Sequence, residues 1–285
     1  MGSGNAGRIC AHVGCRNRQI ILVNMITSIQ NPKIQRVRSL LQRRSSREEE
    51  QAFVIEGARL IHEAFQSGVP LDLVLISSQP SPRAAQLAEE LAAAGILLEK
   101  VSAELFARIS DTENPQGILA IVRQQSPPLR QGWDFLVVAD GLRDPGNLGT
   151  LLRTSAAAAA DGVILTPACA DVYSPKVVRS AMGAHFRLSI LHKTWEEIIT
   201  LCRQRPGQPA RVLVSEVDNG TPCWQVDLRR PLALVIGSEA EGVSSAAKQA
   251  ADQCLIIPMP GQVESLNAAV AAGILLFEVV RQRYP

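Results

Sequence analysis

The stretch "FLVVADGLRDPGNLGTLLR", residues 135–153, joins a short apolar run to a polar, glycine-containing loop and then to a helical segment. Similar runs recur along the C-terminal half, separated by helical stretches: "GVILT" (162–166), "RVLVSEV" (211–217), "LALVIGSE" (232–239) and "CLIIPM" (254–259). Continuous apolar runs are typical of parallel strands that are buried on both faces. Because strands and helices alternate, this half of the chain is predicted to be a parallel α/β domain.

The N-terminal half also alternates strands with helices. "AFVIEGARLIHEAFQSG" predicts a strand, a glycine turn and an amphipathic helix, and "LDLVLIS" and "GILAIV" predict two further strands. Two prolines and a glycine in "RQQSPPLRQG" are typical of a linker. We therefore predict four segments: a disordered extension (1–24), a small α/β domain (25–123), a linker (124–132) and the parallel α/β domain (133–285).

Composition excludes several classes of protein. Hydrophobic residues make up 46% of the chain and charged residues 20%, which is typical of a soluble protein with a sizeable core. The longest uncharged apolar stretch, residues 265–277, is shorter than the roughly 20 residues that cross a bilayer. "IILVNMI" (20–26) does not make a convincing secretory signal, and the six cysteines form no CxxC pair. We expect a cytoplasmic protein with no membrane anchor and no metal.

Positive charge is concentrated near the N-terminus. Residues 1–47 hold nine Lys or Arg and no acidic residue, whereas the remainder has a net charge of −7. Basic segments of this kind attract the phosphate backbone of nucleic acids, because each neutralised phosphate releases counterions. A solvated surface is the alternative interpretation. For the RNA-binding role we select four residues in the first predicted helix and just after it: Lys33, Arg36, Arg43 and Arg44.

Polar residues gather where three of the predicted C-terminal strands end. The segments concerned are "DGLRDPGNLG", "GSEAEGVS" and "PGQVESLNAAVA". Ligands of parallel α/β sheets bind at the carboxyl ends of the strands, so one shared site is predicted. The spacing of "DPGNLG" does not fit the GxGxxG pattern of dinucleotide-binding proteins, which argues against an NAD enzyme.

The individual residues also have simpler explanations. Asn147 is expected to open a helix that carries Arg153 about two turns further on, and Ser265 is expected to open the last helix. Each polar residue could merely cap a helix or sit on the surface, and Gly237 could be only a turn residue. Asn267 is expected inside the first turn of the apolar last helix, where a buried amide needs a hydrogen-bond partner.

Three segments together resemble the motifs of a known family. "DPGNLGTLLRTSAAAAADGVIL", "LVIGSEAEGVS" and "IPMPGQVESLNAAVAAGILLFE" resemble, in order and spacing, the motifs of SpoU/TrmH-like RNA 2'-O-ribose methyltransferases of the SPOUT superfamily. Upstream, "FVIEGARLIHEAF" and "TENPQGILAIV" are similar to the substrate-binding domain related to ribosomal protein L30e that precedes many of these catalytic domains. The resemblance covers residues 25–282.

This resemblance implies a deep trefoil knot in the C-terminal domain, a homodimer, and S-adenosylmethionine as cofactor. The cofactor-binding residues that it implies are Gly237, Ile257, Pro258, Gly261 and Leu266. The catalytic residues that it implies are Asn147, Arg153, Glu239, Ser265 and Asn267.

Within that set, Arg153 would lie near the attacking 2'-hydroxyl. A free arginine stays protonated and does not act as a base, so we predict the position of this side chain and leave open which group takes the proton. Asn147 and Glu239 would orient it, and Ser265 and Asn267 would fix the last loop.

The function predicted from the sequence is methylation of a ribose 2'-oxygen in structured RNA, with 23S-type ribosomal RNA favoured as substrate. Transfer RNA is an alternative substrate. A protein of another class, a non-catalytic RNA-binding or ribosome-assembly factor with the same fold, also stays open. The complete set of polar residues argues against a non-catalytic role.

Overall fold

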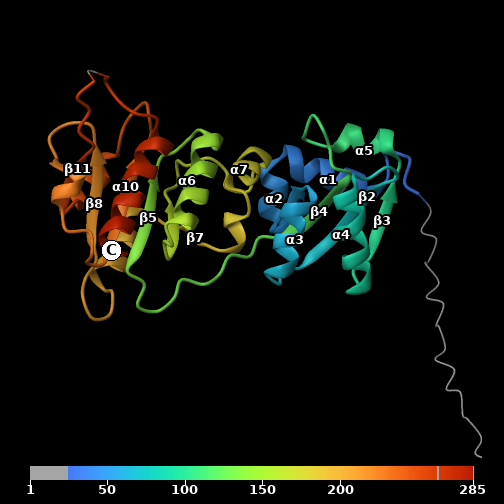
Figure 1. The fold of residues 1–285 in the computed structure, drawn as a ribbon, viewed down its shortest axis with the longest axis horizontal. Helices are drawn as coiled ribbons and strands as arrows, with labels where there is room; N and C mark the ends of the chain where they lie inside the picture. Colours follow the sequence, from blue (N-terminus) through green and yellow to red (C-terminus); the bar gives the residue numbers. More distant parts are fainter. Residues whose placement is uncertain (1–24, 262, 285) are drawn as a thin grey trace, which may run out of the picture.

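A computed structural model describes residues 25–261 and 263–284. The extension expected at 1–24 lies outside the described residues. Two bodies lie side by side along the long axis of the molecule, and each is built on its own β-sheet (Figure 1). The expected α/β class is confirmed, with a parallel C-terminal sheet and a smaller sheet before it.

The N-terminal body has a four-stranded sheet with the order β1-β4-β2-β3. Strand β4 runs antiparallel to both of its neighbours, while β2 and β3 are parallel. Two apolar clusters lie in this body. Its elements are α1 (Pro32–Gln42), α2 (Arg44–Glu50), β1 (Ala52–Glu56), α3 (Ala58–Gln66), β2 (Leu71–Ser77), α4 (Pro82–Ala93), β3 (Leu98–Val101), α5 (Ala103–Ile109) and β4 (Ile118–Arg123).

The C-terminal body has a seven-stranded sheet with the order β7-β6-β5-β10-β8-β11-β9, and every pair of neighbouring strands is parallel. Its strands are β5 (Phe135–Asp140), β6 (Gly162–Leu165), β7 (Ser189–His192), β8 (Arg211–Glu216), β9 (Thr221–Pro222), β10 (Leu232–Gly237) and β11 (Gln253–Ile256). Its helices are α6 (Pro145–Ala157), α7 (Pro175–Ala181), α8 (Trp195–Arg203), α9 (Ser245–Ala250) and α10 (Ala268–Arg283), with two short 3₁₀ turns, Ala184–Phe186 and Cys223–Gln225.

Burial on both faces explains why the predicted strands of this sheet are continuously apolar. In β5, Val137 packs into the cluster beneath α6 and α10, whereas Val138 packs into the cluster beneath α8 and α9 on the other face. Strands β7 and β9 were not predicted. They contain only four and two residues at the edges of the sheet, and such short runs give little periodic signal.

The two bodies share a packed interface. Phe53 of β1 lies against Tyr173 and His185 of the C-terminal body, with ring centroids 4.9 and 5.7 Å away. Burial lowers the pKa of His185 to about 4, and its Nε2 atom lies 2.7 Å from the Val172 carbonyl oxygen. The position of the N-terminal body is therefore set by packed side chains as well as by the chain connection between β4 and β5.

A buried ion pair crosses the same interface. Arg47 of α2 is only 5% exposed, and its Nε donates to the Asp171 carboxylate at 2.8 Å. Its Nη1 donates to the Leu40 carbonyl oxygen. The basic residues near the N-terminus thus include one, Arg47, that joins the two bodies, because a buried guanidinium requires a carboxylate and further acceptors.

Candidate active site

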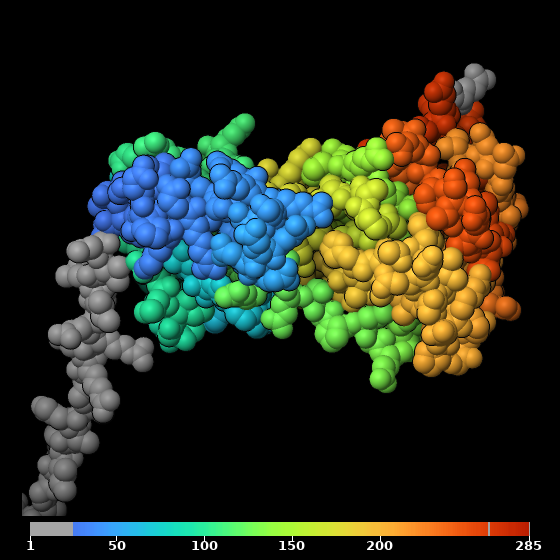
Figure 2. All heavy atoms as spheres, turned by 180° about the vertical axis from the view of Figure 1, so that it is seen from behind, coloured from blue at the N-terminus to red at the C-terminus, as the bar shows by residue number. Residues whose placement is uncertain are grey.

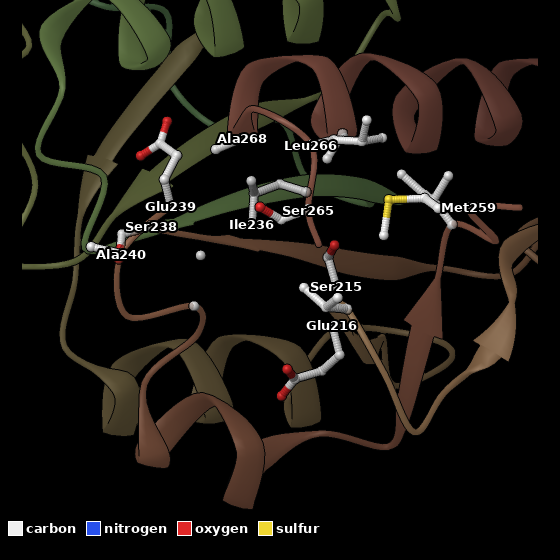
Figure 3. Close-up of a pocket in the computed structure, with 15 residues that line it drawn as sticks. Ser215, Glu216, Ile236, Ser238, Glu239, Ala240, Met259, Ser265, Leu266 and Ala268 are labelled. Atoms are coloured by element: carbon white, nitrogen blue, oxygen red, sulfur yellow. The ribbon is translucent and has the colours of Figure 1, made fainter. Parts of the chain in front are cut away.

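A cavity of about 300 Å³ lies at the carboxyl edge of the C-terminal sheet (Figure 3). Its walls come from the ends of β8 and β10, from the segment after β11 and from the start of α10. These segments are far apart in sequence and meet here because parallel strands end at the same edge of a sheet.

Three of the five predicted cofactor residues line this cavity: Gly237, Ile257 and Leu266. Pro258 and Gly261 are not among the lining residues. Two residues of the predicted catalytic set, Glu239 and Ser265, also line it. The cavity therefore brings together side chains from the second and third motif segments.

Gly237 is required by the tight turn that follows β10. A Cβ atom at this position would lie 2.4 Å from the backbone carbonyl of Gly242, which is closer than real Cβ contacts. The backbone N–H of Ser238 donates to the Gly242 carbonyl at 3.0 Å, and the N–H of Gly242 donates to the Ser238 carbonyl at 2.9 Å. These two hydrogen bonds close the turn, which places Gly237, Ser238, Glu239, Ala240 and Gly242 at the cavity wall.

A chain of amides connects the three predicted motif segments. The side-chain amide of Asn147 donates to the Glu239 carboxylate, and the amide of Asn267 donates to Oδ1 of Asn147 at 3.0 Å. Asn147 belongs to α6, Glu239 follows β10, and Asn267 precedes α10. The three segments that were predicted to share one site are thus linked by side-chain hydrogen bonds.

Asn267 lies just before its helix, and the expectation that it lies inside the first turn was wrong. Helix α10 begins at Ala268, and Asn267 caps it by accepting from the backbone N–H groups of Ala269 and Val270 at 3.0 and 3.2 Å. Its oxygen therefore holds the helix start while its nitrogen holds Asn147. Ser265 lies further upstream and does not open the helix.

The start of α6 also differs from the expectation. Asp144 caps the helix by accepting from the Asn147 N–H at 2.8 Å, so Asn147 lies within the first turn. This hydrogen bond, with Lys176 nearby, lowers the pKa of Asp144. Gly149 faces α7, where a Cβ atom would lie 2.7 Å from the Val177 carbonyl oxygen, so this glycine serves close helix packing.

Arg153 stands apart from the amide chain. It lies two turns into α6 with an exposed side chain, and it is not among the residues that line the cavity. Within residues 25–261 and 263–284 it has no hydrogen bond or ion pair through its guanidinium. Its charge is therefore available to a ligand that approaches α6 from solvent.

Sequence reasoning missed part of the cavity wall. Ser215, Glu216 and Val217 line it at the end of β8, and Met259 lines it after β11. The rule that ligands bind beyond the carboxyl ends of parallel strands applied equally to "RVLVSEV" and would have identified the first three.

Asp140 was also missed; it is buried at the end of β5 and accepts from Ser244 N–H at 2.6 Å.

The four residues predicted to bind RNA lie on α1, between α1 and α2, and at the start of α2, and three of them are paired with carboxylates. Lys33 pairs with Glu99. Arg36 pairs with Glu50 at 2.6 Å and with Asp72 at 3.1 Å, and Arg44 pairs with Glu48 at 2.7 Å. Arg43 is exposed and has no such partner in the described part of the chain. Their role in RNA binding stays a prediction. Three of the four positive charges are already paired with carboxylates of the protein.

None of the helices that the structure describes is long and apolar enough to cross a membrane. Over the same residues, no group of three or more His, Cys, Asp or Glu side chains is arranged to hold a metal ion.

Comparison with known proteins gives the family. Residues 134–277 match the SpoU rRNA Methylase family, and residues 31–120 match the MRM3-like substrate binding domain. The chain belongs to the SpoU rRNA methylase family.

Two relatives illustrate the similarity. The 23S rRNA (guanosine(2553)-2'-O)-methyltransferase RlmP of Bacillus subtilis is 30% identical, over 90% of this chain and 99% of its own length. The SpoU methyltransferase AviRb of Streptomyces viridochromogenes, solved in complex with AdoMet, superposes with a TM-score of 0.81 at 30% identity, over 89% of this chain and 98% of that one.

A third similar protein is the AdoMet-bound rRNA methyltransferase of Sinorhizobium meliloti. It has a TM-score of 0.80 at 30% identity, and the match covers 92% of this chain and 98% of that chain. The similarity to these structures extends over both bodies of the fold.

The two functions of the Asn267 side chain can be separated by substitution. Asn267→Ala removes the helix cap and the hydrogen bond to Asn147, and we expect it to lower the free energy of unfolding by about 1 kcal/mol. Asn267→Asp keeps a capping oxygen but cannot donate to Asn147, so its stability should stay near that of the wild type. Thermal unfolding of both variants measures this difference; equal losses would contradict the capping role.

Proposed function

We propose that this protein transfers a methyl group from S-adenosylmethionine to a ribose 2'-oxygen of structured RNA, with 23S-type ribosomal RNA as the favoured substrate. The observation that carries the proposal is the amide chain Asn147, Glu239 and Asn267, which joins three strand-end segments beside the cavity. Relatives that are named for this reaction and the family membership support it.

The cavity fits the cofactor chemically. Ile257, Met259 and Leu266 give it an apolar wall that suits an adenine ring, while Ser265 and the backbone of the turn after β10 supply polar groups. When bound, S-adenosylmethionine supplies a methyl group that its sulfonium has already activated. Gly237 and Ile257 would hold the cofactor, together with Leu266. Pro258 and Gly261 would act by shaping the loop.

The chain's own residues would then orient the RNA. Holding the ribose oxygen in line with the methyl group supplies much of the acceleration of a transfer reaction. Arg153 would bind the RNA beside the reacting 2'-hydroxyl, since its guanidinium is exposed and has no carboxylate partner in the described residues. Asn147 and Glu239 would keep α6 in register with the turn after β10, and Ser265 and Asn267 would hold the last loop.

The proposal includes further features of the resemblance: a trefoil knot around the segment between β11 and α10, and a cytoplasmic location. It also includes the division into residues 25–123, a linker at 124–132, and residues 133–285. The two separate sheets support this division, since β4 ends at Arg123 and β5 begins at Phe135.

A homodimer through α10 is also proposed. Val270, Ile274 and Phe277 recur at helical spacing and are 52%, 41% and 50% exposed. The opposite face of the helix packs on α6. An apolar stripe of this kind is unfavourable in water unless another surface covers it, and a second copy of the chain is the expected partner.

The dimer is tested by placing charge on this stripe. We expect Ile274→Glu/Phe277→Glu to sediment with the mass of one chain, where the wild type has the mass of two, because two carboxylates would be desolvated in the contact. Leu97→Glu is the matched control, since Leu97 is 80% exposed on the other body. A wild type with the mass of one chain, or a doubly charged variant that still dimerises, contradicts this interface.

The activity is tested by tritium transfer from labelled S-adenosylmethionine to ribosomal RNA and transfer RNA from cells that lack the protein. Nuclease mapping and mass detection of 2'-O-methyl nucleosides should find a methylated site in 23S-type RNA. Methylation of transfer RNA alone would establish the alternative substrate. Cofactor binding without transfer to either RNA, or to ribosomal assembly intermediates, would favour the non-catalytic assembly factor.

A further inference from the structure

A second cavity, of about 320 Å³, lies where the two bodies meet. The N-terminal body contributes Arg59 and Leu60 of α3 and Arg83 of α4 to its lining. The C-terminal body contributes Arg179 of α7 and Met182, which follows that helix. No residue of the proposed methyl-transfer site lines this cavity.

The acidic residues at this cavity, Glu56 and Glu63, already have partners within the protein. Glu56 accepts from the hydroxyl groups of Ser110 and Thr112 at 2.6 and 2.9 Å. Glu63 is largely covered and pairs with Arg187 at 2.7 Å. Arg187 therefore compensates the charge of Glu63, while the Glu56 carboxylate keeps its charge and is held by neutral hydrogen-bond donors.

The arginines are less compensated. Arg179 pairs with Asp111 across the interface. Arg59 and Arg83 are exposed, and within the described residues neither forms an ion pair. Arg59 and Arg83 thus supply unpaired positive charge at this junction. In α1, by contrast, Lys33 and Arg36 are paired with carboxylates.

The cavity also has an apolar part. Leu60 and Met182 line it, and Met182 is 42% exposed although it is a large hydrophobic residue. Cations beside an apolar surface are what an unstacked nucleotide requires, because its phosphate is charged while its base has apolar faces. A flexible methionine adapts to such a flat surface.

The loop between α5 and β4, whose Gln116 lines the junction cavity, projects from the same edge of the molecule as the segment that borders the methyl-transfer site (Figure 1). The loop between α5 and β4, which carries Asp111 and Thr112, rises from the edge on which the segment between β11 and α10 also stands (Figure 1). The view from behind shows both projecting in the same direction (Figure 2). One RNA lying along this edge could reach both sites.

We propose that the junction cavity holds an unstacked nucleotide of the substrate RNA, with its phosphate on Arg59 and Arg83 and its base against Leu60 and Met182. This inference rests on the proposed function for the identity of the RNA. It gives the N-terminal body a specific RNA contact beside the catalytic body, at a site formed by both.

The test compares Arg59→Ala/Arg83→Ala with Lys100→Ala in the full chain. Lys100 is an exposed, unpaired cation of β3, at the opposite edge of the sheet from β1. Filter binding to a 23S ribosomal RNA transcript is measured over a range of salt concentrations. We expect the double variant to bind about 10-fold more weakly with a salt slope lowered by about 1 to 2, since each lost phosphate contact lowers the slope by nearly 1.

Kinetics separate this contact from the catalytic site. The KM for RNA should rise while kcat and S-adenosylmethionine affinity stay within about twofold of the wild type, because the lost contact is remote from the reacting atoms. RNA affinity and salt slope equal to those of Lys100→Ala would overturn the inference. If the wild type binds RNA without methylating it, the proposed function fails, while the comparison of binding still decides this inference. A wild type that binds no RNA overturns both.

Discussion

Arg153→Ala is expected to lower the rate of methyl transfer to RNA by about 100-fold or more, which corresponds to roughly 3 kcal/mol of transition-state stabilisation. The guanidinium is exposed on α6 and has no carboxylate partner in the described part of the chain. Removing it should leave the fold intact and take away a cation that orients the RNA at the reacting ribose. Single-turnover transfer of labelled methyl groups measures this rate.

Two further variants make this result specific. Arg153→Lys keeps the charge but loses the planar, two-pronged donor geometry, so its rate should stay well below that of the wild type. Arg229→Ala removes another exposed arginine, which pairs with Asp227, and should transfer methyl groups at the wild-type rate. If Arg153→Ala transfers methyl groups as fast as the wild type, the proposed catalytic role of this residue is wrong.

Asp171→Ala is expected to lower the free energy of unfolding by about 3 kcal/mol or more. Arg47 is 5% exposed, and the substitution would leave its charge buried without a carboxylate. The Leu40 carbonyl oxygen would still accept from its guanidinium, but an uncharged acceptor compensates only part of the desolvation cost. The interface between the two bodies should therefore loosen before either sheet unfolds.

Urea unfolding monitored separately for the two bodies measures this effect. Asp218→Ala, which removes an exposed aspartate with no partner in the described residues, should change the stability by less than about 0.5 kcal/mol. Arg47→Met/Asp171→Leu should recover much of the loss, because an apolar pair leaves no buried charge. Equal stabilities for Asp171→Ala and Asp218→Ala would show that the ion pair contributes nothing to the interface.

The pattern of apolar runs along the sequence was sufficient to predict the class of fold. The apolar run at 135–140 coincides with β5, and the runs near 162, 211, 232 and 254 each overlap a strand of the parallel sheet. A strand that is buried on both faces must be apolar throughout, so its sequence carries the signal by itself. The short edge strands β7 and β9 carry no such signal and were missed.

The convergence of the three strand-end segments was predicted, because such segments meet at one edge of a parallel sheet. The link between Asn147, Glu239 and Asn267 agrees with that reasoning. The details were not predictable from spacing. Whether an asparagine caps a helix or lies inside its first turn depends on one residue of register, and the structure makes Asn267 the cap of α10.

The sequence by itself determined the alternation of strands and helices, the segments that gather at one sheet edge, and the resemblance to a methyltransferase family. Only the tertiary structure decided which charges are free. Lys33 and Arg36 were predicted from the sequence to bind RNA, but they meet carboxylates from other strands and helices, while Arg47 is buried against Asp171, 124 residues away. Charge compensation depends on distance in space, and the chain order of residues does not specify which carboxylate will lie beside which arginine.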